Sequence, residues 1–331
     1  MILNFYEFFF TTMPTFYKKL LKGVGIAPIS NIIFYGKSAQ GTKTPRTARQ
    51  VRNRKMFFSI LCFSWCLGAL VVMMLLPLQA KAQESWVFLP SDYVFHPLII
   101  DPREPHSAVM AYGTWDRFEG AIGDTIEFVQ WKPGDGSRWA WGIAGASDIQ
   151  LASLGDGVFP EIVSDWYLGT YFSESFGQFS NRLEYMHVSS HLGDSLFETE
   201  QRLIYSRETF KFTTSFDPSD QFRLYGGVGY SGHIMPADRP FYVHAGTELY
   251  SDYWPVSNTS MRGYFGYDVK FLEEAGGVTD QNFELGIQWK AHPEDHRDLR
   301  IAVSYYNGNS QYGQFYRQSD NHWGWAVYFD P

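Results

Sequence analysis

Apolar and polar residues alternate with a period of two along most of the last two-thirds of this chain. Residues 283–290 and 322–329 show the pattern clearly. In the first of these segments Phe283, Leu285 and Ile287 alternate with polar or small residues. Because successive side chains of a β-strand point to opposite faces, this period predicts strands with one apolar face and one polar face.

Segments with this pattern recur about every 16 to 19 residues, and turn residues such as Pro133-Gly134 and Gly276-Gly277 separate them. That spacing is typical of ten-residue strands in transmembrane barrels and too long for a compact sandwich. After Ala82 there is no apolar run long enough for a membrane-spanning helix. We count about 13 candidate strands, near residues 106–115, 121–131, 138–147, 162–173, 178–189, 199–206, 208–216, 222–230, 240–250, 259–271, 283–290, 300–305 and 322–329.

Tryptophan and tyrosine gather near the ends of these segments, for example Trp131, Trp289 and Tyr305. Membrane barrels carry such aromatic girdles at both interfaces, and single-chain bacterial barrels prefer even strand numbers. We therefore predict an all-β fold, an antiparallel transmembrane-type β-barrel of about 12 strands over residues 106–331, with 14 as the next number. A soluble periplasmic β-domain with an aromatic core is the competing interpretation.

Charge divides the 331 residues into two unlike parts. Residues 1–82 carry 11 Lys and Arg against one acid, whereas residues 83–331 carry 16 against 34. The acidic body repels phosphates and argues against a nucleic-acid partner. Both cysteines, Cys62 and Cys66, lie in the basic part, so the acidic part cannot form disulfides.

The basic part has the order of a targeting segment. Basic residues end at Lys55, an apolar run reaches Leu78, and Ala80-Lys81-Ala82 provides a cleavage site. These features predict a secretory signal peptide over residues 56–82, with an uncleaved membrane anchor as the alternative. Residues 1–55 would then be an extension that translation from Met56 would omit.

Residues 83–105 are interrupted by prolines and predict an extended segment, either a periplasmic arm or a lumen segment.

Several short segments between residues 101 and 315 form a specific set when taken together. They are Asp101-Pro102-Arg103-Glu104-Pro105, the run from His187 to Asp194, Tyr205-Ser206-Arg207-Glu208, Arg223-Leu224-Tyr225-Gly226-Gly227, and Tyr306-Asn307-Gly308 with Ser310 and Tyr312-Gly313-Gln314-Phe315. These segments are similar to those of a bacterial family, the domain-of-unknown-function family 1207. The resemblance covers about residues 90–329 and implies an exported outer-membrane protein of Gram-negative bacteria, without an established activity.

One segment could carry chemistry. On a strand, His187 and Ser189 share a face about 7 Å apart, where a histidine can act as general base on a hydroxyl. This His-x-Ser pattern is similar to that of outer-membrane phospholipase A and lipid A deacylase, which implies a lipid acyl hydrolase. Asn usually follows the serine there, and here Ser190 does, so an orienting residue would have to be Asp194 or Glu184. The structural alternative is a polar strand end at the barrel rim.

Charged residues opposite the apolar faces predict a second functional region inside the barrel, where they would pair rather than line a wide pore. We therefore predict an outer-membrane barrel with a structural or narrow channel role. The lipid hydrolase is the alternative function, and the predicted partners are outer-membrane lipid and the barrel-assembly machinery. No cofactor or metal is predicted, except calcium if the hydrolase interpretation holds. The predicted lumen charges are Arg202, Arg223, Arg262, Arg300 and Glu284, with Lys290 and Glu248 on comparable faces.

Overall fold

The computed structural model of the protein describes residues 84–193, 202–237, 239–293 and 297–330. The extension, the predicted signal peptide and Asp194 lie outside these residues. No helix within the described ranges has the length and apolar character needed to cross a membrane.

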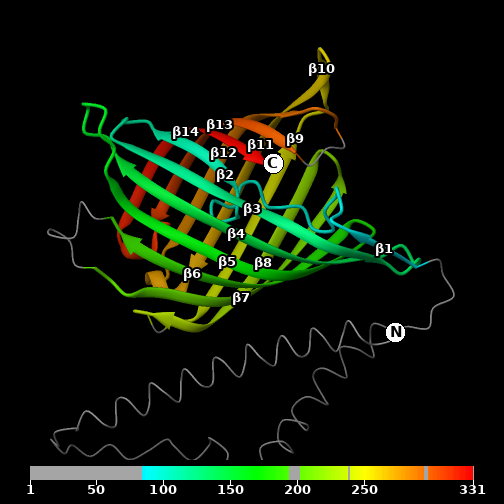
Figure 1. The fold of residues 1–331 in the computed structure, drawn as a ribbon, viewed down its shortest axis with the longest axis horizontal. Coiled ribbons are helices and arrows are strands. Elements are labelled where there is room, and N and C mark those ends of the chain that lie inside the picture. The colour runs from blue at the N-terminus through cyan, green and yellow to red at the C-terminus, as the bar shows by residue number, and fades with distance from the viewer. Residues whose placement is uncertain (1–83, 194–201, 238, 294–296, 331) are drawn as a thin grey trace, which may run out of the picture. The chain divides into compact units, whose positions relative to one another are not determined.

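Twelve antiparallel strands form a closed ring in which each strand pairs with its neighbours in sequence (Figure 1). The ring closes where the first barrel strand pairs with the last, from Ser107 opposite Phe329 to Tyr112 opposite Gly324. Two short strands, β1 (Ser85–Phe88) and β10 (Trp254–Val256), pair on β3 and β11 outside the ring. The barrel strands are β2 (Ser107–Tyr112), β3 (Arg117–Lys132), β4 (Arg138–Ala152), β5 (Glu161–Phe176), β6 (Phe179–Leu192), β7 (Tyr205–Ser219), β8 (Phe222–Met235), β9 (Phe241–Tyr250), β11 (Thr259–Leu272), β12 (Thr279–Lys290), β13 (Asp298–Asn309) and β14 (Ser319–Asp330).

The predicted barrel of 12 strands is confirmed, and the count of 13 candidates is corrected at one place. The candidate near 199–206 is not a separate strand in its described part, residues 202–206, because β7 begins at Tyr205 and runs through the next candidate segment. Residues just before it are held by a side chain instead: Gln314 accepts a hydrogen bond from the Leu203 amide and donates one to the Leu203 carbonyl.

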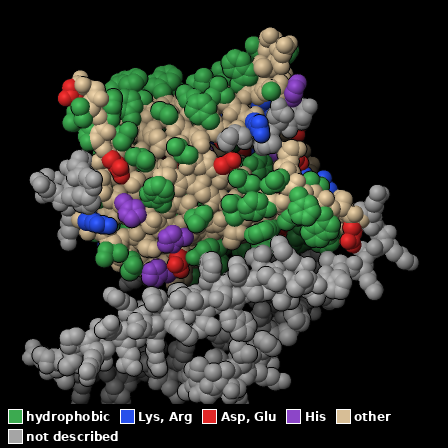
Figure 2. All heavy atoms as spheres, viewed as in Figure 1, with side chains coloured by type: hydrophobic (Ala, Val, Ile, Leu, Met, Phe, Trp, Pro, Cys, Tyr) green, Lys and Arg blue, Asp and Glu red, His purple; other side chains and the backbone are tan. Residues whose placement is uncertain are grey.

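The outer wall of the barrel is apolar and the inner wall is polar. Leu168 and Leu285 point outward and are 66% and 64% exposed, whereas Arg182 and Glu284 point inward and are 1% exposed. Figure 2 shows the hydrophobic side chains spread over one outer face. An exposed apolar belt around a polar interior is the surface of a membrane barrel and not of a soluble β-domain.

One irregularity in β3 adds a polar group to the interior. The register with β4 shifts between Glu127 and Val129, so the alternation changes phase there. As a result both Glu127 and Gln130 face inward, where the Gln130 amide donates to the Glu127 carboxylate at 2.8 Å.

Residues 89–105, which we call the strap, lie inside the ring between β1 and β2 (Figure 1). Phe95, Leu98 and Ile100 have no exposed surface, and the apolar residues clustered with them belong to the barrel wall or to the strap itself. The strap therefore adds apolar side chains to an interior in which the wall has a separate apolar cluster around Tyr167, Met186 and Val188.

The end of the barrel opposite the C-terminal end of β14 is covered from inside by the loop between β13 and β14. Gly313 donates to the Asp165 carboxylate at 2.9 Å, and the Gln314 side chain and amide both bond to Ser190. Strap and loop together leave the lumen filled.

Adding a methyl group at Gly266 should displace the strap. A Cβ there would lie 2.1 Å from the Ile100 side chain, whereas a Cβ at Gly120 meets nothing within 4 Å. We expect Gly266→Ala to cost about 1 to 3 kcal/mol through overpacking. Gly120→Ala should leave stability nearly unchanged. The unfolding midpoint, followed by the heat-dependent shift in gel mobility, measures both; equal midpoints would contradict the placement of Ile100.

Candidate functional site

Charged side chains of the wall hold the backbone of the strap. Arg223 on β8 donates to the carbonyl oxygens of His96 and Pro97 at 2.7 and 2.9 Å. Glu248 on β9 accepts from the Ile99 amide at 3.0 Å. An extended segment without a strand partner must satisfy its buried amides and carbonyls in some other way, and here wall side chains do so.

Arg182 on β6 holds a carboxylate of the strap. Its guanidinium binds both carboxylate oxygens of Glu104, with one contact at 2.7 Å, and lies 3.1 Å from Glu184. The Phe95 ring centroid is 4.7 Å from the same group. A planar guanidinium suits this combination of a two-point carboxylate contact and an aromatic face.

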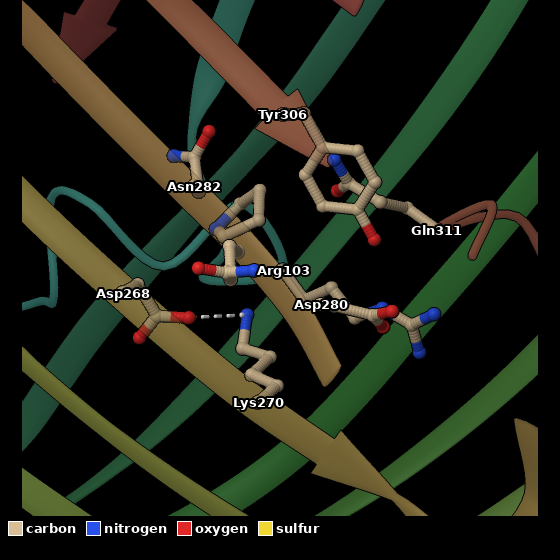
Figure 3. Close-up of a pocket in the computed structure, with 9 residues that line it drawn as sticks. Arg103, Asp268, Lys270, Asp280, Asn282, Tyr306 and Gln311 are labelled. Atoms are coloured by element: carbon tan, nitrogen blue, oxygen red, sulfur yellow. Dashed lines mark ion pairs between the residues drawn. The ribbon is translucent and has the colours of Figure 1, made fainter. Parts of the chain in front are cut away.

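A second charged cluster joins the strap to β9 and β11. The Lys270 ammonium contacts Asp101 of the strap and lies 3.4 Å from Asp268, as the dashed line in Figure 3 shows. His244 lies 3.8 Å from Asp101. Ligand atoms of Asp101, His244 and Asp268 lie within 4.8 Å of one another, a spacing that could hold a metal ion. Lys270 already compensates both carboxylates, so the cluster as it stands is an ionic anchor.

Ionic contacts set the protonation of the two strap carboxylates. Burial alone would raise the pKa of Asp101, but the Lys270 ammonium outweighs it and holds that pKa below its usual range. Burial opposes ionisation of Glu104 too, and Arg182 lowers its pKa. Depressed carboxyl pKa values stabilise the fold above about pH 4 and lose that contribution as the pH falls further. Both anchors are therefore intact at neutral pH.

Three of the predicted lumen charges lie in the interior. Arg223 contacts the strap, and Arg300 lies 2.9 Å from Asp330 and 3.9 Å from Glu284. Glu248, on a comparable face, also contacts the strap, as described above. Arg262 is half-buried at the rim, with its guanidinium 3.7 Å from the Tyr250 ring centroid.

The prediction for Arg202 was wrong. Arg202 precedes β7 and is exposed, because the strand begins three residues later at Tyr205.

The proposed hydrolase residues lie on the opposite side of the wall. In β6, Arg182, Glu184 and Met186 are buried, whereas the alternate residues His187 and Ser189 are half-exposed on the outer face. Figure 2 shows histidine side chains gathered near one rim of this face, beside an acidic group. The structure thus places His187 and Ser189 on one outward face of one strand. Asp194 lies outside the described residues.

A carboxylate that the sequence did not single out lies beside His187. Glu208 of β7 pairs directly opposite His187, and its Oε1 is 3.9 Å from the His187 Nδ1. Glu184, the other carboxylate considered, points into the lumen toward Arg182 and Lys211. Glu208 opened a candidate strand in the sequence, but only the register between β6 and β7 brings it next to His187.

A closed antiparallel ring with an apolar exterior and a filled, charged interior defines an outer-membrane-type β-barrel. A family model described as "Protein of unknown function (DUF1207)" matches residues 75–330. The chain therefore belongs to this family, which confirms the resemblance found in the sequence. No curated protein matches the sequence.

Similar solved structures are outer-membrane barrels at low identity. Outer membrane phospholipase A from Escherichia coli shares 11% identity with a TM-score of 0.44 and covers 70% of this chain and 93% of its own. KdgM porin in complex with disordered oligogalacturonate shares 10% with a TM-score of 0.35 and covers 68% and 99%. OmpT of Vibrio cholerae shares 7% with a TM-score of 0.30 and covers 75% and 99%. At these values the likeness carries no conclusion about activity or location.

Removing the Arg182 guanidinium should destabilise the barrel strongly. Arg182→Ala leaves Glu104 buried without its cation and Glu184 with Lys211 alone. Breaking a buried ion pair in this way costs about 3 to 5 kcal/mol. Arg262→Ala, at the half-buried rim, is the matched control and should cost much less. Denaturant unfolding of the two variants measures the difference. Equal losses would mean that Arg182 does not hold the strap.

Proposed function

We propose that this protein is a narrow outer-membrane channel that the strap holds closed. The observation that carries the proposal is the chemistry of the contact between strap and wall. Non-covalent polar contacts anchor the strap to the wall. On its N-terminal side the strap continues into β1, which lies at the end of the barrel where β14 ends. Export by the segment over residues 56–82, and insertion by the barrel-assembly machinery into outer-membrane lipid, are part of this proposal.

A polar contact of this kind favours a movable strap over a purely structural filling. Buried ion pairs are often less stabilising than well-packed apolar residues of similar volume. An interior that only had to support the wall would gain stability from apolar packing. Side chains such as Arg223 and Lys270 can instead bind water once the strap leaves, so the wall stays solvated in both states.

Neutralising the two strap carboxylates should open the channel. The variant Asp101→Asn with Glu104→Gln keeps the size of both side chains and removes both ionic anchors. In planar bilayers we expect the wild type to stay closed for most of the recording and the variant to open at least about tenfold more often, a change of 1.4 kcal/mol.

Asp92→Asn is the matched control for this measurement. Asp92 precedes the buried part of the strap and pairs with Arg138 at a site where both side chains are partly exposed, so its loss is worth at most about 1 kcal/mol. Gly266→Ala, which displaces Ile100 by volume, provides a second opening variant if the double variant does not fold. Folded variants that are as silent as the wild type would leave the barrel a structural one.

A second function, lipid acyl hydrolysis, has one specific observation in its favour. Glu208 lies opposite His187 on the neighbouring strand, and Ser189 lies two residues further along β6 on the same outer face. We call these three residues, which could act as acid, base and nucleophile, the row. His187 would accept the hydroxyl proton as Ser189 Oγ bonds to the ester carbonyl carbon. The lipid alcohol would leave with that proton, and water would then release the fatty acid from the serine.

The position of this row along β6 sets the membrane leaflet that it would meet. The connections at the end of the barrel where β14 ends include the two-residue turns 177–178 and 220–221. The opposite end carries the longer connections 153–160 and 193–204. Short turns face the periplasm in outer-membrane barrels and long loops face the exterior. His187 and Ser189 lie near the end with long loops, so outer-leaflet lipid would be the substrate.

His187→Ala and Ser189→Ala should each abolish fatty-acid release from phospholipid or lipid A in detergent with calcium. Glu208→Gln should lower kcat roughly a hundredfold or more, because a carboxylate that orients a histidine supports general-base catalysis. His191→Ala, on the same outer face of β6 but outside the row, is the control and should keep full activity. No fatty-acid release by the wild type would end this interpretation.

A further inference from the structure

The strap carries one cation at its inner tip. Arg103 lies between Asp101 and Glu104, the two carboxylates that anchor the strap. It helps to line a pocket in the part of the lumen that we call the upper lumen, next to Asp280 and Tyr306 (Figure 3). Arg103 keeps part of its surface exposed, unlike the anchors on either side of it.

Carboxylates outnumber cations on the wall that surrounds this tip. Among the described strand residues, eight carboxylates and four Lys or Arg side chains are buried. Adding Arg207 and Lys211, whose side chains are 12% and 13% exposed, still leaves the carboxylates in excess. The eight are Glu127, Asp148, Asp165, Glu184, Glu248, Asp268, Asp280 and Glu284.

Arg103 attracts three of these carboxylates electrostatically, namely Asp148, Asp165 and Asp280. Arg207 also attracts Asp165, and Lys270 also attracts Asp280. Asp148 and Asp165 are direct cross-strand partners on β4 and β5, an arrangement of like charges that is unfavourable without a cation. The Asp165 Oδ1 has no hydrogen-bond partner among the described residues. The upper lumen is therefore built around a positive charge that the strap supplies.

Three tyrosines and a further carboxylate are electrostatic neighbours of the Arg103 guanidinium. The tyrosines are Tyr167, Tyr205 and Tyr306, each on a different strand of the wall, and the carboxylate is Glu274. A planar organic cation gains attraction from ring faces in addition to carboxylates, whereas a strongly hydrated ion such as Na⁺ gains less from them.

We propose that Arg103 occupies a site for organic cations, and that guanidinium-type or amine-type solutes bind among Asp148, Asp165, Asp280 and the three tyrosines when the strap leaves. This inference rests on the channel proposed above and adds the class of solute. The strap would then close the lumen with a group of the same chemistry as the solute, so that solute and strap compete for one site.

Chemical rescue tests the site with the barrel closed. Arg103→Ala removes the strap's cation from the neighbourhood of Asp148, Asp165 and Asp280 and should lower the unfolding midpoint of the purified full-length protein. Millimolar methylguanidinium should restore most of the loss, and the same concentration of sodium should not. Arg138→Ala, which removes a guanidinium from the exposed entrance of the strap, is the control and should not be rescued. Equal effects of the two salts on Arg103→Ala would overturn the site.

Permeation tests the solute class separately. In the opened variant Asp101→Asn with Glu104→Gln, methylguanidinium should permeate several-fold better than sodium, and both better than chloride. Asp280→Asn added to this variant should reduce that preference, and Asp156→Asn in an exposed loop should not. Openings that do not prefer cations would refute the inference and leave the channel standing. Absence of openings would refute the channel, while the rescue experiment still decides whether Arg103 marks a cation site.

Discussion

Pairing of buried charge is the constraint on which the rest of this structure depends. An ion taken out of water into the lumen is tolerated only when an opposite charge or several hydrogen bonds compensate it. Glu104 with Arg182 and Asp101 with Lys270 meet this requirement by joining the strap to the wall. The position of the strap and the filling of the lumen depend on these two pairs.

A single sequence period gives the barrel two surfaces with unlike chemistry. Along β6, every second residue is buried in the charged interior, and the residues between them lie on the outer face. Interior and exterior can therefore carry separate functions, because the wall isolates the lumen charges from groups such as His187. The two proposed functions do not compete for residues.

The strands were largely predictable from the sequence because alternation is a local property. Contacts between distant segments were not. Glu104 and Arg182 are 78 positions apart, and Asp101 and Lys270 are 169 positions apart. Glu208 next to His187 depends on the register between two strands, which alternation alone does not fix. Arg202 was misplaced for a similar reason, since the sequence did not show where β7 begins.

The closing pair of strands has a consequence for the order of assembly. β2 directly follows the strap. The ring is complete only when β2 pairs with β14, and the residues of β14 are synthesised after those of the other barrel strands. The wall partners of the strap come from β6, β8, β9, β11 and β13, which are all synthesised after β2 and before β14. Placing the strap among its wall partners and pairing β2 with β14 are therefore late and coupled steps. A chain that lacks its final strand would hold neither a sealed wall nor a filled interior.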